Sequence, residues 1–213
     1  MTAAAWRHIV VEGPIGVGKT SLAHRLARQL DADLMLERPQ DNPFLQRFYA
    51  DMEGYAFQVQ LSFLFQRAKQ VAELTQTKLF ARPVVADYLF AKDALFARLT
   101  LTDEEHRLYT QMYHQLAHDV SEPDVVIWLQ ASPATLLRRI HQRAIPMERD
   151  IDEAYLQRLC DAYVDHFHGY RGAPVLAIDT EQLNPVASDA DFTSLLDRLA
   201  AAPRPGIRTP AAR

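Results

Sequence analysis

The sequence predicts an α/β fold in which helices cover both faces of a five-stranded parallel sheet. Five short apolar runs are separated by longer segments whose apolar residues recur at helical spacing. Such continuous apolar runs are typical of parallel strands, which are buried on both faces. A length of 213 residues, with 48% hydrophobic and 23% charged residues, suits one globular domain with a substantial core. The predicted strands are 9–11, 34–37, 83–87, 124–129 and 174–178.

A glycine-rich loop follows the first strand. Residues 13–20 match the pattern G-x-x-x-x-G-K-S/T, and Leu22, Leu26 and Leu30 then recur on one helical face. In such a strand–loop–helix unit, backbone N–H groups, the lysine and the helix N-terminus converge on the phosphates of a nucleoside triphosphate, and the threonine hydroxyl is a ligand of Mg²⁺. The predicted nucleotide-binding residues are Gly13, Pro14, Ile15, Gly16, Val17, Gly18, Lys19, Thr20 and Ser21, with Thr20 as the metal ligand.

Proline positions and apolar spacing define the next elements. The second strand, 34–37, stops before Pro39, because proline lacks an N–H donor and restricts the residue before it. Asn42-Pro43 opens a short helix, and a longer helix over 54–77 carries apolar residues at helical spacing. The third strand, 83–87, ends on a carboxylate.

Capping signals predict where the later helices begin. Thr102 and Glu105 form a capping box, and so do Asp150 and Glu153. Ser132 is followed by proline, a favourable pair for the start of a helix that runs to about residue 143. A final helix is expected near 189–201, after the fifth strand.

Composition argues against several classes of protein. A formal net charge of −4 disfavours a dedicated nucleic-acid surface. No apolar run approaches the roughly 18 residues that span a bilayer, and there is no signal-peptide pattern, so we expect a cytoplasmic protein that does not bind membranes. The single cysteine, Cys160, cannot form an internal disulfide. We expect one domain over 1–201 and a disordered tail over 202–213.

Two predicted strands end on acids, Glu37 and Asp87. Because ligands of parallel sheets bind at the carboxyl ends of the strands, both side chains should face the phosphate loop. A carboxylate placed near the γ-phosphate can remove the proton of a hydroxyl acceptor, which is worth about 10²–10⁴ in rate. Glu37 is therefore a candidate general base, and a solvated carboxylate before a proline turn is the alternative.

Basic and aromatic residues supply the remaining candidates. Arginines at 138–143, followed by Glu148, are suited to a lid that closes over a triphosphate and neutralises its charge, with 144–146 as the mobile part. The aromatic residues between 44 and 57 can stack on a flat base while the amide of Gln58 pairs with its edge, although core packing explains these aromatics equally well.

Four stretches, in this order, resemble the deoxynucleoside kinases, particularly bacterial deoxyadenosine/deoxyguanosine kinase-like members. They are LERPQDNPFLQRFYAD, AFQVQLSFLFQR, ADYLFAKDALFA and RRIHQRAIPME. The resemblance covers about residues 8–180. The phosphate loop is common to many families, whereas the Glu-x-Pro stretch, the Phe-Gln pair and the lid that ends in glutamate are more specific in combination.

The resemblance implies a P-loop kinase fold with an arginine-bearing lid, and a homodimer formed through long helices. It also implies transfer of the ATP γ-phosphate, with Mg²⁺, to a deoxynucleoside 5′-hydroxyl. By position, Glu37 falls on the general base and Gln58 on the amide that pairs with the base, next to Phe57. Tyr49 and Glu148 fall on the pair that holds the sugar 3′-hydroxyl. Arg139 and Arg143 fall on lid arginines that contact ATP.

The sequence departs from this family in two places. An acid-Arg-Ser triplet usually follows the third strand, but this chain has Ala86-Asp87-Tyr88 there. Asp87 is the candidate for the metal role of the acid, and Lys92 and Arg67 are both candidates for the missing positive charge. The lid also has His141 and Ile145 where arginines are common. These departures are compatible with slow turnover or an unusual acceptor.

Three other functions fit the phosphate loop. A nucleoside-monophosphate or other small-metabolite kinase shares the loop and an arginine lid, but Tyr49, Gln58 and Glu148 would have no role in it. A catalytically weak relative that binds nucleotide and acts through a partner is consistent with the missing arginine. A GTP-dependent switch protein also needs a guanine-binding N-K-x-D motif. The sequence lacks this motif, because both asparagines, Asn42 and Asn184, are followed by proline.

Overall fold

The computed structural model describes residues 6–77, 82–117 and 120–203. Within these residues, five strands form an all-parallel sheet in the order β2-β3-β1-β4-β5, which confirms the predicted fold class. Each strand begins and ends within two residues of its predicted bounds. The strands are β1 (His8–Glu12), β2 (Asp33–Met35), β3 (Val84–Ala86), β4 (Val125–Gln130) and β5 (Val175–Asp179).

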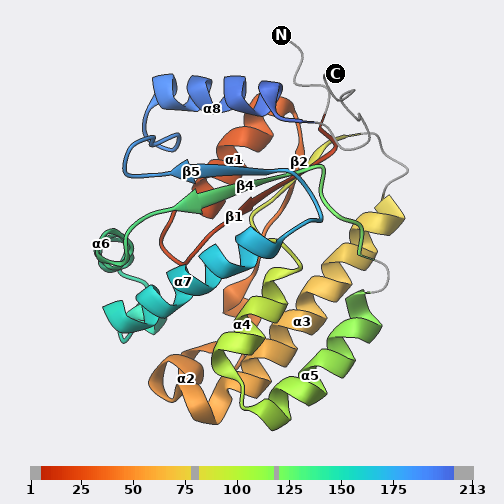
Figure 1. The fold of residues 1–213 in the computed structure, drawn as a ribbon, viewed down its shortest axis with the longest axis vertical. Coiled ribbons are helices and arrows are strands. Elements are labelled where there is room, and N and C mark those ends of the chain that lie inside the picture. The colour runs from red at the N-terminus through yellow and green to blue at the C-terminus, as the bar shows by residue number, and fades with distance from the viewer. Residues whose placement is uncertain (1–5, 78–81, 118–119, 204–213) are drawn as a thin grey trace, which may run out of the picture.

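Helices lie on both sides of the sheet. In Figure 1, α1 and α8 lie on one side of it, and α7, α4, α3 and α5 lie on the other. The short 3₁₀ turns Pro39–Asp41 and Pro146–Glu148 lie in the connections between helices and strands. The helices are α1 (Lys19–Leu30), α2 (Leu45–Ala50), α3 (Met52–Thr77), α4 (Lys92–Thr100), α5 (Asp103–Leu116), α6 (Pro133–Arg143), α7 (Glu153–Gly169) and α8 (Asp189–Ala201).

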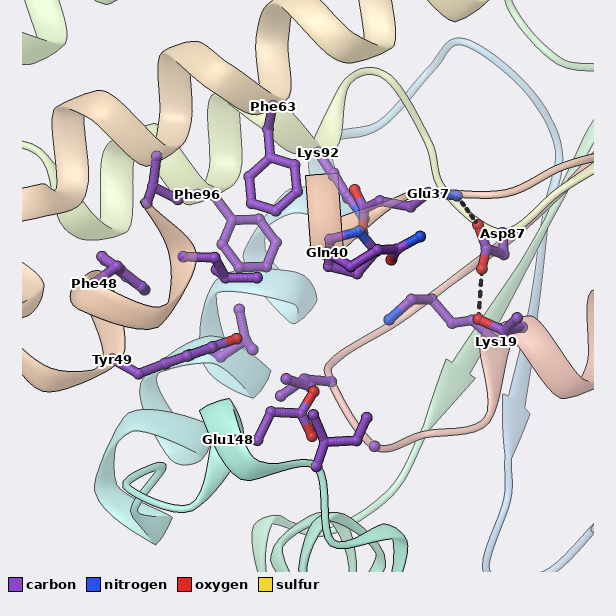
Figure 2. Close-up of a pocket in the computed structure, with 18 of the residues that line it drawn as sticks. Lys19, Glu37, Gln40, Phe48, Tyr49, Phe63, Asp87, Lys92, Phe96 and Glu148 are labelled. Carbon is purple, nitrogen blue, oxygen red and sulfur yellow. Dashed lines mark hydrogen bonds and ion pairs between the residues drawn. The ribbon is translucent and has the colours of Figure 1, made fainter. Parts of the chain in front are cut away.

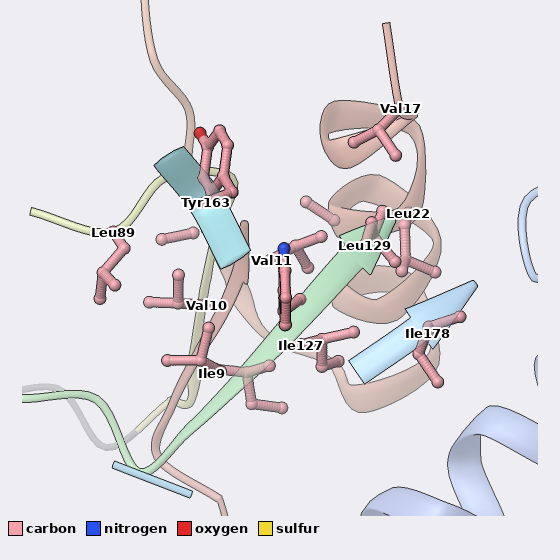
Figure 3. Close-up of a cluster of buried hydrophobic side chains, with 14 of the residues drawn as sticks. Ile9, Val10, Val11, Val17, Leu22, Leu89, Ile127, Leu129, Tyr163 and Ile178 are labelled. Atoms are coloured by element: carbon pink, nitrogen blue, oxygen red, sulfur yellow. The ribbon is translucent and has the colours of Figure 1, made fainter. Parts of the chain in front are cut away.

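The central strands β1 and β4 form the middle of the hydrophobic core. Ile9, Val11, Ile127 and Leu129 are fully buried, and Figure 3 shows them packed together with Leu22 of α1. Full burial of one such side chain contributes about 1.5–3 kcal/mol. These runs are continuously apolar because helices cover both faces of the strands, as the sequence predicts.

The capping predictions are confirmed at two helices and wrong at a third. Thr102 and Glu105 form the capping box of α5, and the Ser132 side chain caps α6. The cap of α7 is Asp152, whose side chain accepts a hydrogen bond from the backbone N–H of Tyr155. The predicted Asp150 therefore lies two residues too early, because a second aspartate stands nearer the first helical turn.

Helix α4 is absent from the sequence prediction. Its first two residues, Lys92 and Asp93, are charged yet buried, so the segment lacks the polar outer face that indicates a helix at the surface. The helix follows β3 closely and packs against α3, α5 and α7. Its first turn therefore lies inside the molecule rather than at its surface.

The topology defines where a ligand can bind. β1 lies between β3 and β4 in the sheet. The connection that leads from β3 to β4 therefore crosses from one side of β1 to the other. Such a reversal leaves a crevice at the carboxyl ends of the strands. Among the residues described, no helix combines the length and the apolar character needed to cross a membrane. Helix α8 ends at Ala201, and residues 204–213 of the predicted tail lie outside the described residues, so the predicted division into domain and tail stays a prediction.

Candidate active site

A cavity of about 400 Å³ lies beside the phosphate loop at the carboxyl ends of the strands. Its walls come from the phosphate loop, the segment after β2, helices α2, α3 and α7, the start of α4 and the segment after α6. Figure 2 shows Lys19, Glu37 and Lys92 gathered on one side, with Tyr49 and Glu148 facing them across the cavity. Residues that are far apart in the chain thus line one space.

The phosphate loop depends on glycine at two positions. Gly16 has a φ of 82°, and a Cβ atom there would lie 2.9 Å from Cγ1 of Ile140. At Gly13 a Cβ atom would lie 2.4 Å from the carbonyl oxygen of Leu129. A larger residue at either position would clash with its neighbours, so glycine allows the close approach of loop to sheet and helix.

Lys19 points back onto the loop that carries it. Its Nζ donates hydrogen bonds to the carbonyl oxygens of Gly13, at 2.7 Å, and Pro14, at 3.1 Å. Burial, followed by the charge of Lys92, lowers the pKa of Lys19 to about 8, although nearby carboxylates oppose this shift. Phosphate oxygens would offer this ammonium better partners than two carbonyl groups do.

Glu37 is held by two cations. Arg67 donates to Oε1 of Glu37 from Nε, at 3.0 Å, and from Nη2, and Lys92 donates to Oε2 from Nζ at 3.2 Å. Burial alone would raise the pKa of the Glu37 carboxyl, but the charges of Arg67 and then Lys92 outweigh burial and hold that pKa well below its usual range. Glu37 is therefore an ionised carboxylate at the wall of the cavity.

Both candidates for the missing positive charge contact Glu37, and each has a second carboxylate partner. Arg67 forms an ion pair through Nη1 with Asp93, whose side chain is fully buried. Lys92 lies 3.9 Å from Oε2 of Glu12. The structure thus brings both candidates for the missing positive charge to the carboxylate of Glu37.

Asp87 joins the phosphate loop to the segment that carries Glu37. Its Oδ2 accepts a hydrogen bond of 2.5 Å from the hydroxyl of Thr20, and its Oδ1 accepts one of 2.7 Å from the backbone N–H of Glu37. Both bonds are drawn in Figure 2. The two predicted metal ligands, Thr20 and Asp87, are therefore in direct contact, next to Lys19.

The far side of the cavity carries the pair expected to hold a sugar hydroxyl. Tyr49 and Glu148 both line the cavity, and Glu148 accepts a hydrogen bond of 2.7 Å from Nε of Arg143. Burial, followed by Tyr155 and Glu148, raises the pKa of Tyr49 well above its usual value. Tyr49 is therefore a neutral hydroxyl donor close to an acid.

Two predicted substrate residues, Phe57 and Gln58, do not reach the cavity. Phe57 packs against the buried cluster that contains Leu64, and Gln58 lines a shallow groove on another face of α3. Gln60 lines the cavity instead, at 3% exposure, and its Nε2 lies 3.4 Å from the hydroxyl of Thr100. Residues two apart on a helix point in nearly opposite directions, which explains the difference.

A spacing in the sequence points to Gln60. Arg67 follows it by seven residues, which is close to two helical turns, so the two side chains share a face of α3. Val59 and Phe63 lie on the same face and also line the cavity. Because Arg67 is a candidate for the missing positive charge of the site, the face that it shares with Gln60 favours Gln60 over Gln58.

The two arginines predicted to belong to a lid have different surroundings. Arg143 lines the cavity, whereas Arg139 lies against the loop after β5. Arg139 donates from Nη1 to the hydroxyl of Thr180, at 2.8 Å, and from Nη2 to its carbonyl oxygen, at 3.2 Å. Nη1 also lies 3.5 Å from the carbonyl oxygen of Val17. Arg139 thus links the phosphate loop to the segment after β5 and does not line the cavity.

Glu12 is a buried carboxylate that the sequence analysis does not identify. It accepts hydrogen bonds from the backbone N–H groups of Gly13, at 2.8 Å, and Leu89, at 2.6 Å, and from the Tyr163 hydroxyl at 2.9 Å. It therefore fixes the start of the phosphate loop to the segment after β3 and to α7. Its position at the end of β1, like those of Glu37 and Asp87 after β2 and β3, is the signal that could have identified it.

A family model and individual relatives agree on the family to which this chain is similar. Residues 9–201 match the family model described as deoxynucleoside kinase. The chain is 35% identical over 189 residues to a deoxyguanosine kinase of Bacillus subtilis, covering 86% of this chain and 91% of the relative. It is 34% identical over 188 residues to a deoxyadenosine kinase of Dictyostelium discoideum, covering 83% and 76% respectively.

Among solved structures, a deoxyadenosine kinase from M. mycoides with bound dATP has the same fold. Its TM-score is 0.78 at 22% identity, and the match covers 91% of this chain and 99% of that chain. The family match decides between the kinases that the phosphate loop allows. The chain belongs to the deoxynucleoside kinase family and is a phosphotransferase that phosphorylates deoxynucleosides.

Proposed function

We propose that this enzyme transfers the γ-phosphate of ATP to the 5′-hydroxyl of a deoxynucleoside, with Glu37 as the general base. The observation that supports the proposal is that Glu37 and Lys19 line one cavity, so that a carboxylate and a phosphate-binding lysine serve the same space. Glu37 takes the proton of the 5′-hydroxyl as the new O–P bond forms, while Lys19 and the N-terminus of α1 stabilise the phosphates.

The residues beside Lys19 suit Mg²⁺. This ion keeps several waters and takes few protein oxygens besides those of substrate phosphates. The hydroxyl of Thr20 and the carboxylate of Asp87, 2.5 Å apart, are such oxygens, and we propose that they hold the ion directly or through water. When bound, Mg²⁺ neutralises phosphate charge. Asp87 also orients Glu37, because its carboxylate accepts a hydrogen bond from the backbone N–H of Glu37.

We propose Tyr49 and Glu148 as the partners of the sugar 3′-hydroxyl, because both line the side of the cavity that faces Glu37. Phe48, Phe63 and Phe96 line the same cavity and are suited to contact a flat base. The two relatives described above are named for deoxyguanosine and deoxyadenosine, which supports a purine deoxynucleoside as the acceptor.

A substrate panel tests this function. We expect ADP release with ATP and Mg²⁺ to be fastest for deoxyguanosine or deoxyadenosine, slower for ribonucleosides, and absent with nucleoside monophosphates. The measurement is a coupled ADP assay over all natural nucleosides and monophosphates, with the product identified by mass spectrometry. Faster transfer to a monophosphate than to any deoxynucleoside would contradict the proposal.

We propose Gln60, in place of Gln58, as the amide that pairs with the base. The Gln60→Ala variant should raise KM for the best deoxynucleoside by about 10-fold or more, because a buried hydrogen bond to the base is worth roughly 1.5 kcal/mol. The Gln58→Ala variant is the matched control on the same helix, and its KM should stay within about twofold of wild type. The opposite ranking in steady-state kinetics would restore Gln58.

We also propose a homodimer that forms through the long helices. Phe65 is 51% exposed on α3 and Leu108 is 49% exposed on α5, and both are large apolar side chains on adjacent helices. Light scattering should give twice the chain mass of 24.2 kDa. Phe65→Ser should shift this mass towards the monomer, whereas Val164→Ser, at an exposed position on α7, should not. A monomeric wild type would contradict this proposal.

A further inference from the structure

Lys92 occupies a position that is unfavourable for a lysine. It is the first residue of α4 and only 3% exposed. Burial removes water from the ammonium, and the N-terminus of a helix carries positive partial charge, so both effects disfavour a cation there. Glu37 at 3.2 Å and Glu12 at 3.9 Å offset this cost. Residues that cost stability persist where activity needs them, and Lys92 lines the cavity beside the candidate base.

The contacts of Arg67 show why it is less suited to act on a substrate. Its Nε and Nη2 contact Glu37, its Nη1 contacts Asp93, and its guanidinium lies 4.9 Å from the ring centre of Phe63. Each edge of the planar group is already engaged, so Arg67 would lose an ion pair by turning towards a ligand. Arg67 therefore acts as an anchor that orients the Glu37 carboxylate.

The contacts of Lys92 are fewer and more easily exchanged. Among the described residues, its hydrogen bond runs to Glu37, and Glu12 is beyond hydrogen-bond distance. Glu12 is itself held by Gly13, Leu89 and Tyr163. An ammonium on a flexible stem can keep its attraction to this fixed carboxylate while one N–H turns to a new acceptor.

We propose that Lys92 is a catalytic residue of the phosphoryl transfer, donating a hydrogen bond to the attacking 5′-oxygen and to the phosphoryl group that is transferred. This inference rests on the proposed transfer of the γ-phosphate to the 5′-hydroxyl. The proton of the 5′-hydroxyl passes to Glu37, the 5′-oxygen forms a bond to the γ-phosphorus, and the bond between that phosphorus and the β–γ bridging oxygen breaks to leave ADP. Lys92 transfers no proton in this step and stabilises charge on the reacting oxygens.

Two single variants and a double variant test the proposal. The variants Lys92→Met, Glu37→Gln and the combination of both are compared in steady-state and rapid-quench kinetics with ATP, Mg²⁺ and the best acceptor. We expect Lys92→Met to lower kcat by about 10²–10³-fold, the range for loss of a donor aimed at transition-state charge, with KM for both substrates within about threefold. The double variant should be at least about 10-fold slower than Glu37→Gln alone.

Two further variants separate chemistry from folding. Lys92→Arg should recover part of kcat, since it restores a cation at the same place. Lys69→Met, at an exposed lysine on α3, should behave as wild type. Lys92→Met is expected to fold, because Arg67 still pairs with Glu37 and three donors still hold Glu12. If its thermal melt shows otherwise, Lys92→Gln takes its place in the same series and is judged by the same kcat criterion.

The outcomes distinguish this inference from the proposed base. Wild-type kcat in Lys92→Met, or an effect on KM alone, would overturn the catalytic role of Lys92. A double variant no slower than Glu37→Gln would also overturn it, because Lys92 would then act only by orienting Glu37. Wild-type kcat in Glu37→Gln would instead remove Glu37 as the base, and a loss of kcat in Lys92→Met would still support the contact of Lys92 with the reacting oxygens.

Discussion

Replacement of Lys19 by alanine is expected to lower kcat by at least about 10²–10³-fold, the loss seen when a donor to transition-state charge is removed. Lys19 lies in the phosphate loop, and its Nζ is held within the loop by the carbonyl oxygens of Gly13 and Pro14, ready to exchange them for phosphate oxygens. The measurement is the rate of deoxynucleoside phosphorylation at saturating ATP and Mg²⁺. Affinity for ATP should weaken as well, since the same ammonium contacts the ground-state phosphates.

The control for this experiment is Lys69→Ala, which removes an exposed lysine from α3 and should leave kcat unchanged. Thermal melts should show that Lys19→Ala is folded, because the glycines and the core that shape the loop remain in place. Activity within about 10-fold of wild type in a folded Lys19→Ala protein would contradict the role of Lys19 in binding the transferred phosphate.

The Glu37→Gln variant is expected to lower kcat by about 10²–10⁴-fold, with ATP affinity largely unchanged. The amide keeps the shape of the side chain but cannot accept the proton, and it removes the negative charge that Arg67 and Lys92 share. Because these two cations hold the pKa of Glu37 well below its usual value, the wild-type carboxylate should stay ionised throughout the neutral range. Protonation of Glu37 should therefore cause no loss of kcat between about pH 6 and 8.

Glu37→Asp is the matched variant for this prediction. It keeps the charge but withdraws the carboxylate by one methylene, so it should be intermediate between wild type and Glu37→Gln. Rapid-quench measurement of the chemical step would separate this loss from slow product release. Wild-type turnover in Glu37→Gln would show that another group accepts the proton, or that transfer proceeds without a protein base.

The fold could be predicted because its signals are local and strong. β1 and β4 are central strands with helices on both faces, so their sequences are uninterrupted apolar runs. β2 is an edge strand of three residues with Leu34 39% exposed, and its predicted end at Glu37 is two residues too late. Helix α4 gave no such signal, because buried charges at its start hide its periodicity.

The phosphate loop and the acids at the strand ends could also be predicted from the sequence. The loop is one contiguous segment, and the carboxyl ends of parallel strands meet at one edge of the sheet, so Glu37 and Asp87 were expected near Lys19. The side chain of α3 that faces the cavity could not be predicted in this way, because the face that is buried depends on how the helix is rotated against the sheet. Gln58 and Gln60 are both polar, and packing alone distinguishes them.

The sequence by itself determined the architecture, the nucleotide-binding loop and the family, because these depend on patterns that are contiguous or repeat at the periods of helix and strand. Only the tertiary structure decided which charges pair with one another. Arg67, Lys92 and Glu37 lie on three separate segments, and no local pattern records their contact. The strength of an ion pair depends on distance and burial, and both exist only once the chain has folded.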